Sequence, residues 1–377
     1  MKKFVLIPDS FKGTLSSLKI CEIMSSSIKK FFPDAKIVQI PVADGGEGSV
    51  DCFLSALGGE KVFITASDPY MQKITAFYGI LPDKKTAVIE MSACAGLPLV
   101  ENNKNPLKTT TFGVGELVLD AISKGVTKII LGLGGSSTND FGCGMAYALG
   151  VRFFDSDSVS FMPVGESLEK VRKIDISNLD KRLKNVEIIT MCDIDNPPYG
   201  KNGASHVFAP QKGASEQDVI LLDNGVKNIC DVYFKDYGKD LSNLKGGGAA
   251  GAMGAGMVAF FDSKLQMGIN AVLDAVDFTS KIKDADYIFT GEGKIDSQSL
   301  RGKVVIGVSR VAKNYGVPVI AIVGGAEGDL KDAYNEGVSA IFTINKLPKD
   351  FSISRYDSEE NLEFTMDNLL RILKLNS

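Results

Sequence analysis

The stretch PVIAIVGG, residues 318–325, has no charged or polar side chain. A strand that is apolar at every position is typical of a parallel sheet with helices on both faces. The flanking sequence supports this reading: helical patterns cover residues 303–316 and 329–337, and further apolar runs lie at 285–291 and 339–345. The alternation of strand and helix predicts an α/β fold.

The N-terminal segment repeats this alternation, whereas the middle of the chain departs from it. Strand patterns at 3–8 and 35–43 alternate with helical patterns at 17–32 and 47–58. Between residues 61 and 93, three apolar runs follow one another with only short turns between them, which predicts hairpins. We therefore predict two domains. Residues 1–61 and 285–377 form a discontinuous Rossmann-like domain, and residues 62–284 form an α/β domain inserted into it.

Composition argues against several classes of function. The 377 residues carry a net charge of −4 without a block of Lys and Arg, so we expect no nucleic-acid partner. The apolar run at 3–8 is too short for a signal peptide or a membrane span. Six cysteines without a CxxC pair indicate reduced thiols in a cytoplasmic protein and disfavour a zinc site. With His206 as the only histidine, the chemistry must fall mainly to Asp, Glu, Lys, Arg and backbone N–H groups.

Five polar, glycine-rich clusters follow apolar strands. They occupy residues 9–14, 43–48, 134–140, 192–200 and 290–303. In doubly wound sheets, ligands bind outside the carboxyl ends of the strands, and a helix that begins there favours phosphate. The cluster GGSSTND at 134–140 has two interpretations. It forms an anion cradle, or Asn139 or Asp140 caps the next helix while the glycines permit close packing.

A second glycine-rich run covers residues 244–261. It contains Gly254-x-Gly256-x-x-Ala259, a partial match to the dinucleotide-binding fingerprint. No strand pattern precedes it, which disfavours a dehydrogenase and favours a close-packed helix start beside a nucleotide pocket. The P-loop pattern GxxxxGK[ST] does not occur in the chain.

The clusters together carry the residue types that phosphoryl transfer needs. Hard oxygen ligands for Mg²⁺ are offered by Asp44, Glu47, Asp193, Asp195, Glu292 and Asp296. Positive charge for phosphate is offered by Lys12, Lys294, Arg301 and Lys303. Ser136 lies outside any GxSxG elbow, which favours a phosphate contact or a cap over a nucleophile. His206 has two readings, a hydrogen-bonded structural histidine or a contact to substrate. This mixture of metal ligands, cations and carboxylates is typical of kinases.

The ordered motifs DSFKGTLSS, PVADGGEGSVD, TTTFGVGELVLDA, GLGGSSTNDFGCGMAYALG, CDIDNPPYG and TGEGKIDSQSLRGK resemble those of the bacterial glycerate kinase family, from residue 4 to about residue 370. The resemblance implies ATP-dependent phosphorylation of D-glycerate, a divalent metal, a cytoplasmic location, and one Rossmann-like and one flavodoxin-like domain. It also implies that glycerate and ATP bind in the cleft between the domains. The family's motif positions correspond to Lys12, Asp44, Glu47, Asp193, Glu292 and Asp296. The step from Asp195 to Tyr199 departs from the family pattern.

On this basis we assign roles to individual residues. The expected catalytic residues are Asp193, which orients the substrate hydroxyl, with Lys12 and Lys294. The expected substrate contacts are Ser10, Lys12, Asp44, Asn196, His206 and Arg301. The expected ATP contacts are Gly134, Gly135, Ser136, Asn139, Asp140, Gly247, Gly248 and Gly291. The expected Mg²⁺ ligands are Asp193, Glu292 and Asp296.

The expected product is 2-phosphoglycerate. Phosphorylation of the 3-hydroxyl and a non-catalytic sensor of sugar acids are the alternatives. We expect no membrane partner, and a homo-oligomer is left open.

Overall fold

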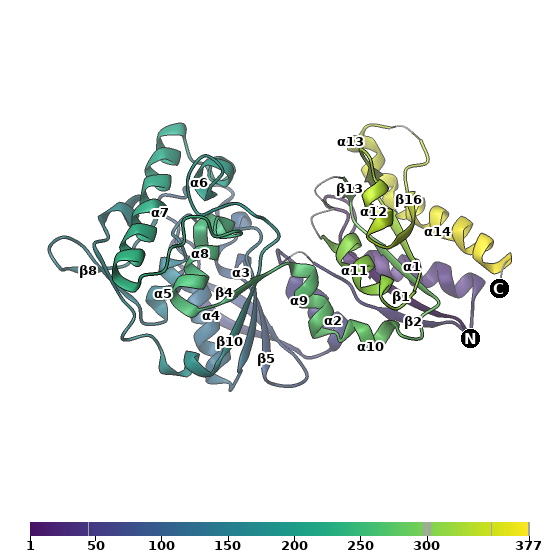
Figure 1. Cartoon of the computed structure of the whole chain (residues 1–377), viewed down its shortest axis with the longest axis horizontal. Coiled ribbons are helices and arrows are strands. Elements are labelled where there is room, and N and C mark those ends of the chain that lie inside the picture. Colours follow the sequence, from purple (N-terminus) through teal and green to yellow (C-terminus); the bar gives the residue numbers. More distant parts are fainter. Residues whose placement is uncertain (44, 297–298, 300–302, 348, 376–377) are drawn as a thin grey trace. The chain divides into compact units, whose positions relative to one another are not determined.

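The computed structural model describes residues 1–43, 45–296, 299, 303–347 and 349–375. The chain forms two compact units (Figure 1). The first unit comprises Met1–Asp44, Asp51–Leu57 and Met267–Ser377, and the second comprises Gly45–Val50 and Gly58–Gln266. The domain limits predicted at residues 61 and 285 stay a prediction.

The first unit contains a five-stranded sheet in which every neighbouring pair is parallel. Its order is β16-β14-β12-β1-β2. The strands are β1 (Lys3–Pro8), β2 (Lys36–Gln39), β12 (Tyr287–Gly291), β14 (Val319–Val323) and β16 (Val338–Thr343), and a two-stranded sheet pairs β13 (Lys294–Ile295) with β15 (Gly325–Ala326). All five residues of β14 are buried, as its apolar sequence predicts.

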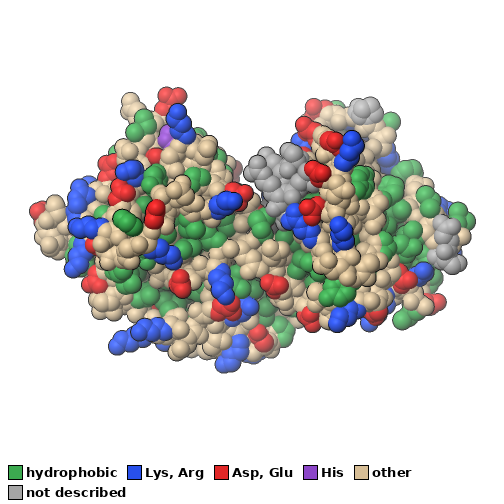
Figure 2. Space-filling view, in the orientation of Figure 1, with side chains coloured by type: hydrophobic (Ala, Val, Ile, Leu, Met, Phe, Trp, Pro, Cys, Tyr) green, Lys and Arg blue, Asp and Glu red, His purple; other side chains and the backbone are tan. Residues whose placement is uncertain are grey.

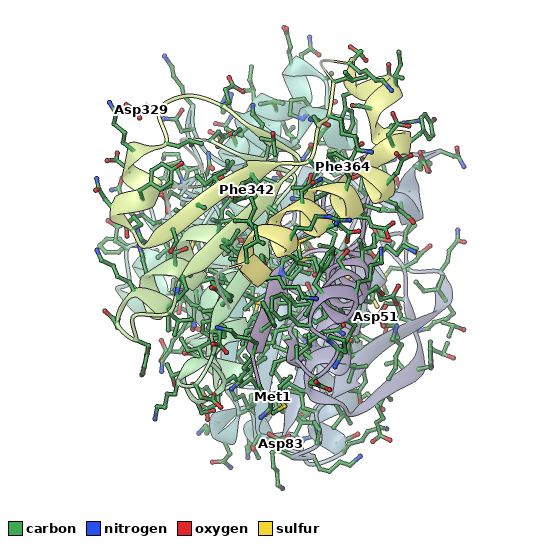
Figure 3. The ribbon with its side chains drawn as sticks, turned by 90° about the vertical axis from the view of Figure 1, so that its right-hand side faces the viewer. Met1, Asp51, Asp83, Asp329, Phe342 and Phe364 are labelled. Atoms are coloured by element: carbon green, nitrogen blue, oxygen red, sulfur yellow. The ribbon has the colours of Figure 1, made fainter. Side chains whose placement is uncertain are left out.

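Helices cover both faces of this sheet. They are α1 (Ser17–Phe31), α9 (Gly268–Ala275), α10 (Phe278–Ile282), α11 (Val304–Lys313), α12 (Lys331–Asn335), α13 (Phe351–Ser354) and α14 (Ser358–Leu375), together with most of α2 (Ser49–Leu57). In β14, Ile320 and Ile322 pack with α1 and α14, whereas Ala321 and Val323 pack with α11. Alternate residues of a strand face opposite sides of the sheet, so both core layers are built from one apolar run. Figure 3 marks β16 at Phe342 and α14 at Phe364.

The second unit contains a six-stranded mixed sheet of order β11-β10-β6-β5-β4-β3. The strands are β3 (Glu60–Ser67), β4 (Lys73–Ile80), β5 (Thr86–Glu90), β6 (Lys128–Gly132), β10 (Glu187–Met191) and β11 (Lys264–Gln266). The pairs β3·β4 and β4·β5 are antiparallel, as expected for the predicted hairpins, and β5, β6, β10 and β11 run parallel. A separate antiparallel sheet contains β7 (Arg152–Phe154), β8 (Ser160–Phe161) and β9 (Lys173–Asp175).

The two longest helices that pack into the core around β5 and β6 of the second unit lie far apart in the chain. These are α4 (Phe112–Ser123) and α8 (Ala249–Phe261). The other helices of this unit are α3 (Ser92–Ala95), α5 (Cys143–Ala148), α6 (Ala204–Phe208) and α7 (Glu216–Tyr237). A second core packs α7 and α8 against the small antiparallel sheet, with Phe153 of β7 and Phe260 of α8 among its buried residues. This packing fixes the loops that leave β5, β6 and β10 at one edge of the sheet.

The predicted α/β class is confirmed. Counted along the chain, the strand order in the first unit is 2-1-3-4-5, an order that occurs in doubly wound sheets, and the sheet of the second unit is mixed. The Rossmann-like label for the first domain and the flavodoxin-like label for the inserted one stay predictions. Apolar periodicity locates strands without giving their order, so the sequence did not predict these orders.

The surface and the cysteines match the composition. On the face shown in Figure 2, Lys and Arg are interspersed with Asp and Glu, so this face has no continuous basic field. All six cysteines are buried thiols. Across the described ranges, no helix combines the length and apolar character needed to cross a membrane.

Candidate functional site

Two neighbouring strands of the first unit bring the first and last predicted clusters together. β1 and β12 lie side by side at the point where the strand order reverses, and their carboxyl ends carry the loops beginning at Asp9 and Glu292. The amide of Asp9 donates to the carbonyl oxygen of Gly291 at 2.8 Å. A Cβ at Gly293 would lie 3.3 Å from the amide nitrogen of Lys12. This reversal point is where doubly wound sheets bind ligands.

Glu292 is the most unusual side chain at this point. It is 6% exposed, and its Oε1 atom has no hydrogen-bond partner among the described residues. The pKa of Glu292 is raised to about 7, chiefly by burial and to a smaller extent by the charges of Asp9 and Asp296, whereas Ser299 and Lys303 oppose the rise. A buried carboxylate with an unused oxygen and two acidic neighbours fits a hard cation such as Mg²⁺.

Three other predicted residues of the first unit follow the same two strands, β1 and β12. Ser10 donates to Asp9 Oδ1 through its amide at 2.6 Å and its hydroxyl at 3.3 Å. Lys12 is exposed on the loop after β1. Lys294 pairs with Glu327 and lies 3.9 Å from Asp296 Oδ2. The Glu327 carboxylate raises the pKa of Lys294, so this lysine is a charged group already engaged with two acids.

Gly291 closes β12 in a position that excludes a side chain. A Cβ there would lie 2.0 Å from the carbonyl oxygen of Ile322. Its role is therefore close packing between β12 and β14, which fixes where the next residue, Glu292, begins.

In the second unit, the loop after β6 carries the cluster GGSSTND. Its first part runs from the surface into the protein: Gly135 is exposed, Gly134 is half-buried, and Ser136 is buried at 8% exposure. The amide of Gly134 donates to the carbonyl oxygen of Gly45 at 2.9 Å, so the backbone at Gly45 packs against this loop. A Cβ at Gly134 would lie 2.5 Å from the Cα of Gly46, and only glycine permits this approach.

The second part of the loop is enclosed. Asp140 is fully buried and accepts hydrogen bonds from the Thr111 amide and hydroxyl, both at 2.8 Å, and from the amides of Gly142 at 3.1 Å and Gly144 at 3.2 Å. Burial raises the pKa of Asp140 against these hydrogen bonds. Its oxygens thus hold the start of α5 and the segment before α4, which agrees with the capping interpretation.

Asn139 is also fully buried. Its Nδ2 donates to Ser205 Oγ at 3.2 Å, whereas Oδ1 has no hydrogen-bond partner among the described residues. Like Asp140, Asn139 is buried and holds the loop through contacts inside the protein.

The glycine-rich run that leads into α8 and forms its first turn packs against this loop. Ala250, Gly251 and Ala252 adopt left-handed backbone angles in succession, with φ values of 52°, 65° and 67°. A Cβ at Gly251 would lie 2.2 Å from the carbonyl oxygen of Thr138. Gly247 and Gly248 are buried, and a Cβ at either would approach Pro198 or Pro197 within 2.8 Å or 2.4 Å. These glycines allow three loops to pack together.

The loop after β10 carries the remaining predicted residues. Asp193 is half-buried two residues beyond the strand. The carbonyl oxygen of Asn196 accepts from the Gly248 amide at 2.9 Å, and Asn196 Nδ2 donates to the carbonyl oxygen of Asn202 at 2.8 Å. His206 Nε2 lies 3.8 Å from Asp223 Oδ2, and Asp223 also accepts from the Gly200 amide at 2.9 Å. His206 therefore has an acidic partner that also anchors the loop.

Two predicted substrate contacts, Asp44 and Arg301, lie outside the described residues. The three predicted metal ligands do not share one unit: Glu292 and Asp296 belong to the first and Asp193 to the second. Over the part of the chain that the structure describes, no group of three or more His, Cys, Asp or Glu side chains could hold a metal ion.

Sequence reasoning missed Lys212. Its ammonium is 2.7 Å from Ser136 Oγ and 2.7 Å from the carbonyl oxygen of Thr138, and the residue is 2% exposed. Burial lowers its pKa to about 7. The sequence PQKGA around it reads as an exposed turn, and no local signal distinguishes this lysine from a surface one.

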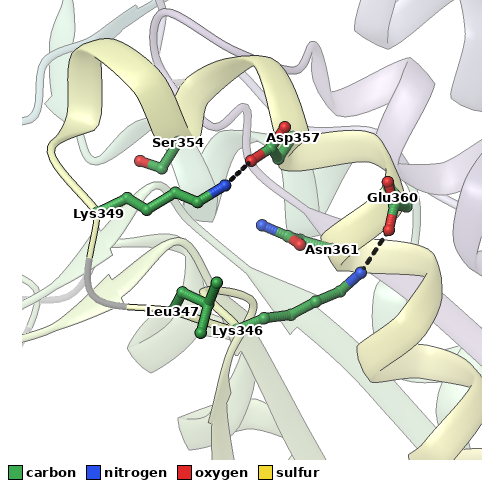
Figure 4. Close-up of a pocket in the computed structure, with 7 residues that line it drawn as sticks. All are labelled: Lys346, Leu347, Lys349, Ser354, Asp357, Glu360 and Asn361. Carbon is green, nitrogen blue, oxygen red and sulfur yellow. Dashed lines mark hydrogen bonds and ion pairs between the residues drawn. The ribbon is translucent and has the colours of Figure 1, made fainter.

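A pocket of about 270 Å³ lies elsewhere in the first unit (Figure 4). It is lined by Lys346, Leu347, Lys349, Ser354, Asp357, Glu360 and Asn361. Lys346 pairs with Glu360 at 2.7 Å and Lys349 with Asp357 at 2.8 Å, so its charges neutralise one another. None of the predicted site residues lines it.

Comparison with known proteins gives concordant matches. A family model described as the glycerate kinase family matches residues 4–374. A glycerate kinase of Bacillus cereus is 42% identical over 376 residues, covering 100% of this chain and 99% of that protein. A glycerate 2-kinase of Escherichia coli is 44% identical, covering 91% and 90%. A crystal structure assigned to glycerate kinase 2 of Salmonella typhimurium LT2 has a TM-score of 0.88 at 40% identity, covering 100% and 99%.

Proposed function

Because the chain belongs to the glycerate kinase family, we propose that it transfers the terminal phosphoryl group of ATP to D-glycerate and forms 2-phosphoglycerate. The observation that carries this proposal is the buried carboxylate of Glu292, with an unused oxygen beside Asp9 and Asp296 at the strand-order reversal of a doubly wound sheet. The name of the Escherichia coli relative, glycerate 2-kinase, supports the position of the phosphate.

The proposed reaction is an in-line displacement at phosphorus. The oxygen of the glycerate 2-hydroxyl attacks the γ-phosphorus, the bond from that phosphorus to the bridging oxygen breaks, and ADP leaves with the electron pair. Asp193 orients the hydroxyl and accepts its proton. Lys12 and Lys294 offset the negative charge on the transferring group, and Lys294 must loosen its pair with Glu327 to do so.

Mg²⁺ fits the carboxylates of the first unit, because Glu292 Oε1 is buried without a partner among the described residues. We propose that Glu292 and Asp296, with Asp193, hold the ion. When bound, it would neutralise phosphate charge on the nucleotide. Without it, the same carboxylates would repel the triphosphate.

Some of the predicted binding residues are proposed to touch a ligand, and others are proposed to hold the binding loops in shape. We propose that Gly134, Gly135 and Ser136 contact ATP. We propose that five buried residues hold the ATP-binding loops in shape through contacts inside the protein: Asn139, Asp140, Gly247, Gly248 and Gly291. Ser10, Lys12, Asn196 and His206, with Asp44 and Arg301, are the proposed contacts to glycerate. Six buried cysteine thiols support a cytoplasmic location.

A coupled assay tests the reaction and its position together. The purified protein is incubated with D-glycerate, ATP and Mg²⁺, together with enolase, pyruvate kinase and lactate dehydrogenase but no phosphoglycerate mutase. We expect glycerate-dependent loss of NADH at once, because enolase accepts 2-phosphoglycerate. A signal that appears only after mutase is added would show phosphorylation at the 3-hydroxyl. Saturable glycerate binding without turnover would show a sensor instead.

A further inference from the structure

Lys212 is a buried lysine that the proposed reaction leaves unused. It ends a short 3-10 turn, Pro210–Lys212, and the next residue, Gly213, has a φ of 97° and packs against Lys104. The turn directs the lysine side chain inward, where its ammonium donates to Ser136 Oγ and to the carbonyl oxygen of Thr138, each at 2.7 Å.

An ammonium in this position is costly to the folded protein. Removing it from water disfavours the charged form, and burial accordingly lowers the pKa of Lys212 to about 7, although the charge of Asp140 opposes this. A methionine of similar length would fill the same space without that cost. The polar head of Lys212 must therefore contribute something other than packing.

The contribution follows from how a hydroxyl forms hydrogen bonds. A serine has one proton to donate and two lone pairs to accept with. Ser136 Oγ accepts from Lys212, so its own proton has to point toward a different acceptor, and the described residues supply none. The adjacent Ser137 differs, because its hydroxyl donates to the carbonyl oxygen of Ala95 at 2.9 Å.

We propose that Lys212 is a positioning residue for ATP: by donating to Ser136 Oγ, its ammonium commits the Ser136 hydroxyl to act as a hydrogen-bond donor to a phosphate oxygen. This inference rests on the proposed function, and it concerns residues 134–136 of the loop after β6. The second bond of Lys212, to the carbonyl oxygen of Thr138, ties the following residues of the same loop to the lysine.

The test measures binding of ATP to the full-length protein by titration calorimetry, without glycerate. We expect K212M and S136A each to weaken ATP binding about tenfold, since one charge-assisted hydrogen bond is at stake. The double variant should have the same affinity for ATP as the single variant with the lower affinity, because both changes remove the same donor. S137A, whose hydroxyl proton already has an acceptor inside the protein, is the matched control and should bind ATP as the wild type does.

Three outcomes would overturn the inference: wild-type affinity in S136A, multiplying losses in the double variant, or an equal loss in S137A. S136A keeps the test valid if K212M does not fold. Calorimetry measures ATP binding directly and therefore tests this inference independently of the coupled assay. Failure of the coupled assay would count against the proposed reaction, whereas this inference would still be decided by calorimetry.

Discussion

Glu292 illustrates at the scale of one residue how a site can oppose stability. Its carboxyl group is 6% exposed, and one oxygen lacks a partner among the described residues. Folding therefore removes a carboxylate from water without full compensation. Such a group is kept in a folded protein when a ligand supplies what the protein does not.

The substitution Glu292→Gln should separate these two effects. We expect the free energy of unfolding at pH 8, in chelator, to rise by about 1 to 2 kcal/mol, because a neutral amide loses less on burial. Glycerate phosphorylation should fall at least a hundredfold. Urea titration and the coupled assay measure the two quantities. A variant that is fully active, or that is less stable than the wild type, would contradict this account.

We propose that Asp193 orients the substrate hydroxyl and accepts its proton. Asp193→Asn keeps the size of the side chain and removes its ability to take up a proton, so we expect kcat to fall about a hundredfold to ten-thousandfold. The melting temperature should stay within a few degrees of the wild-type value, because the side chain is only half-buried. Asp157→Asn, at an exposed position of the same unit, serves as the control. Wild-type turnover in Asp193→Asn would remove Asp193 from the mechanism.

At the scale of elements, the site depends on loops that approach one another more closely than side chains allow. The loop after β6 and the turn at the start of α8 meet at Gly251, where a Cβ would lie 2.2 Å from the carbonyl oxygen of Thr138. The neighbouring Ala250 and Ala252 are held in the same left-handed region. Strained backbone of this kind persists only where the surrounding packing over-determines it.

Gly251→Ala should therefore cost far more than its backbone angle alone. We expect a loss of about 3 kcal/mol or more in the free energy of unfolding, combining left-handed strain with the clash against Thr138. Gly238→Ala is the matched control, because Gly238 has a similar φ of 73° and nothing within 4 Å of its Cβ position. That variant should lose about 1 kcal/mol. Equal losses in urea unfolding would show that the close approach contributes nothing.

At the scale of the whole molecule, Lys212 links stability to pH. Burial lowers its pKa in the folded protein to about 7, from an ordinary value of 10.5. Between these values the unfolded chain holds more protons on this lysine than the folded one does. Its contribution to the free energy of unfolding therefore rises with pH across this interval, by at most about 1.4 kcal/mol per pH unit.

Comparison with Lys212→Met isolates this contribution from that of the buried thiols and tyrosines, whose pKa values burial also shifts between the unfolded and the folded chain. We expect the difference in the free energy of unfolding, wild type minus variant, to increase between pH 7.5 and 9.5. Lys85→Met, at an exposed position, should show a constant difference. Urea titrations at four pH values measure both slopes. A difference that stays flat for Lys212→Met would mean that the buried lysine does not titrate in this range.

Much of the fold follows from the sequence because periodicity is local. The apolar run 318–325 predicts a buried central strand, and β14 is one, with both neighbours parallel. The glycine-rich clusters were expected at the carboxyl ends of strands, and the loops after β1, β6, β10 and β12 lie there. Strand order was not predictable from the same patterns, because it depends on which distant segments pair.

The sequence by itself determined the α/β class, the strand ends where polar clusters gather, and the family whose motifs they form. Only the tertiary structure decided which of those polar residues face outward. Asp140 is enclosed by donors from Thr111 and Gly144, and Lys212 is buried against Ser136, 76 residues away in the chain. Burial depends on contacts between segments far apart in sequence, so a lysine in a turn and a lysine in a core look alike until the chain has folded.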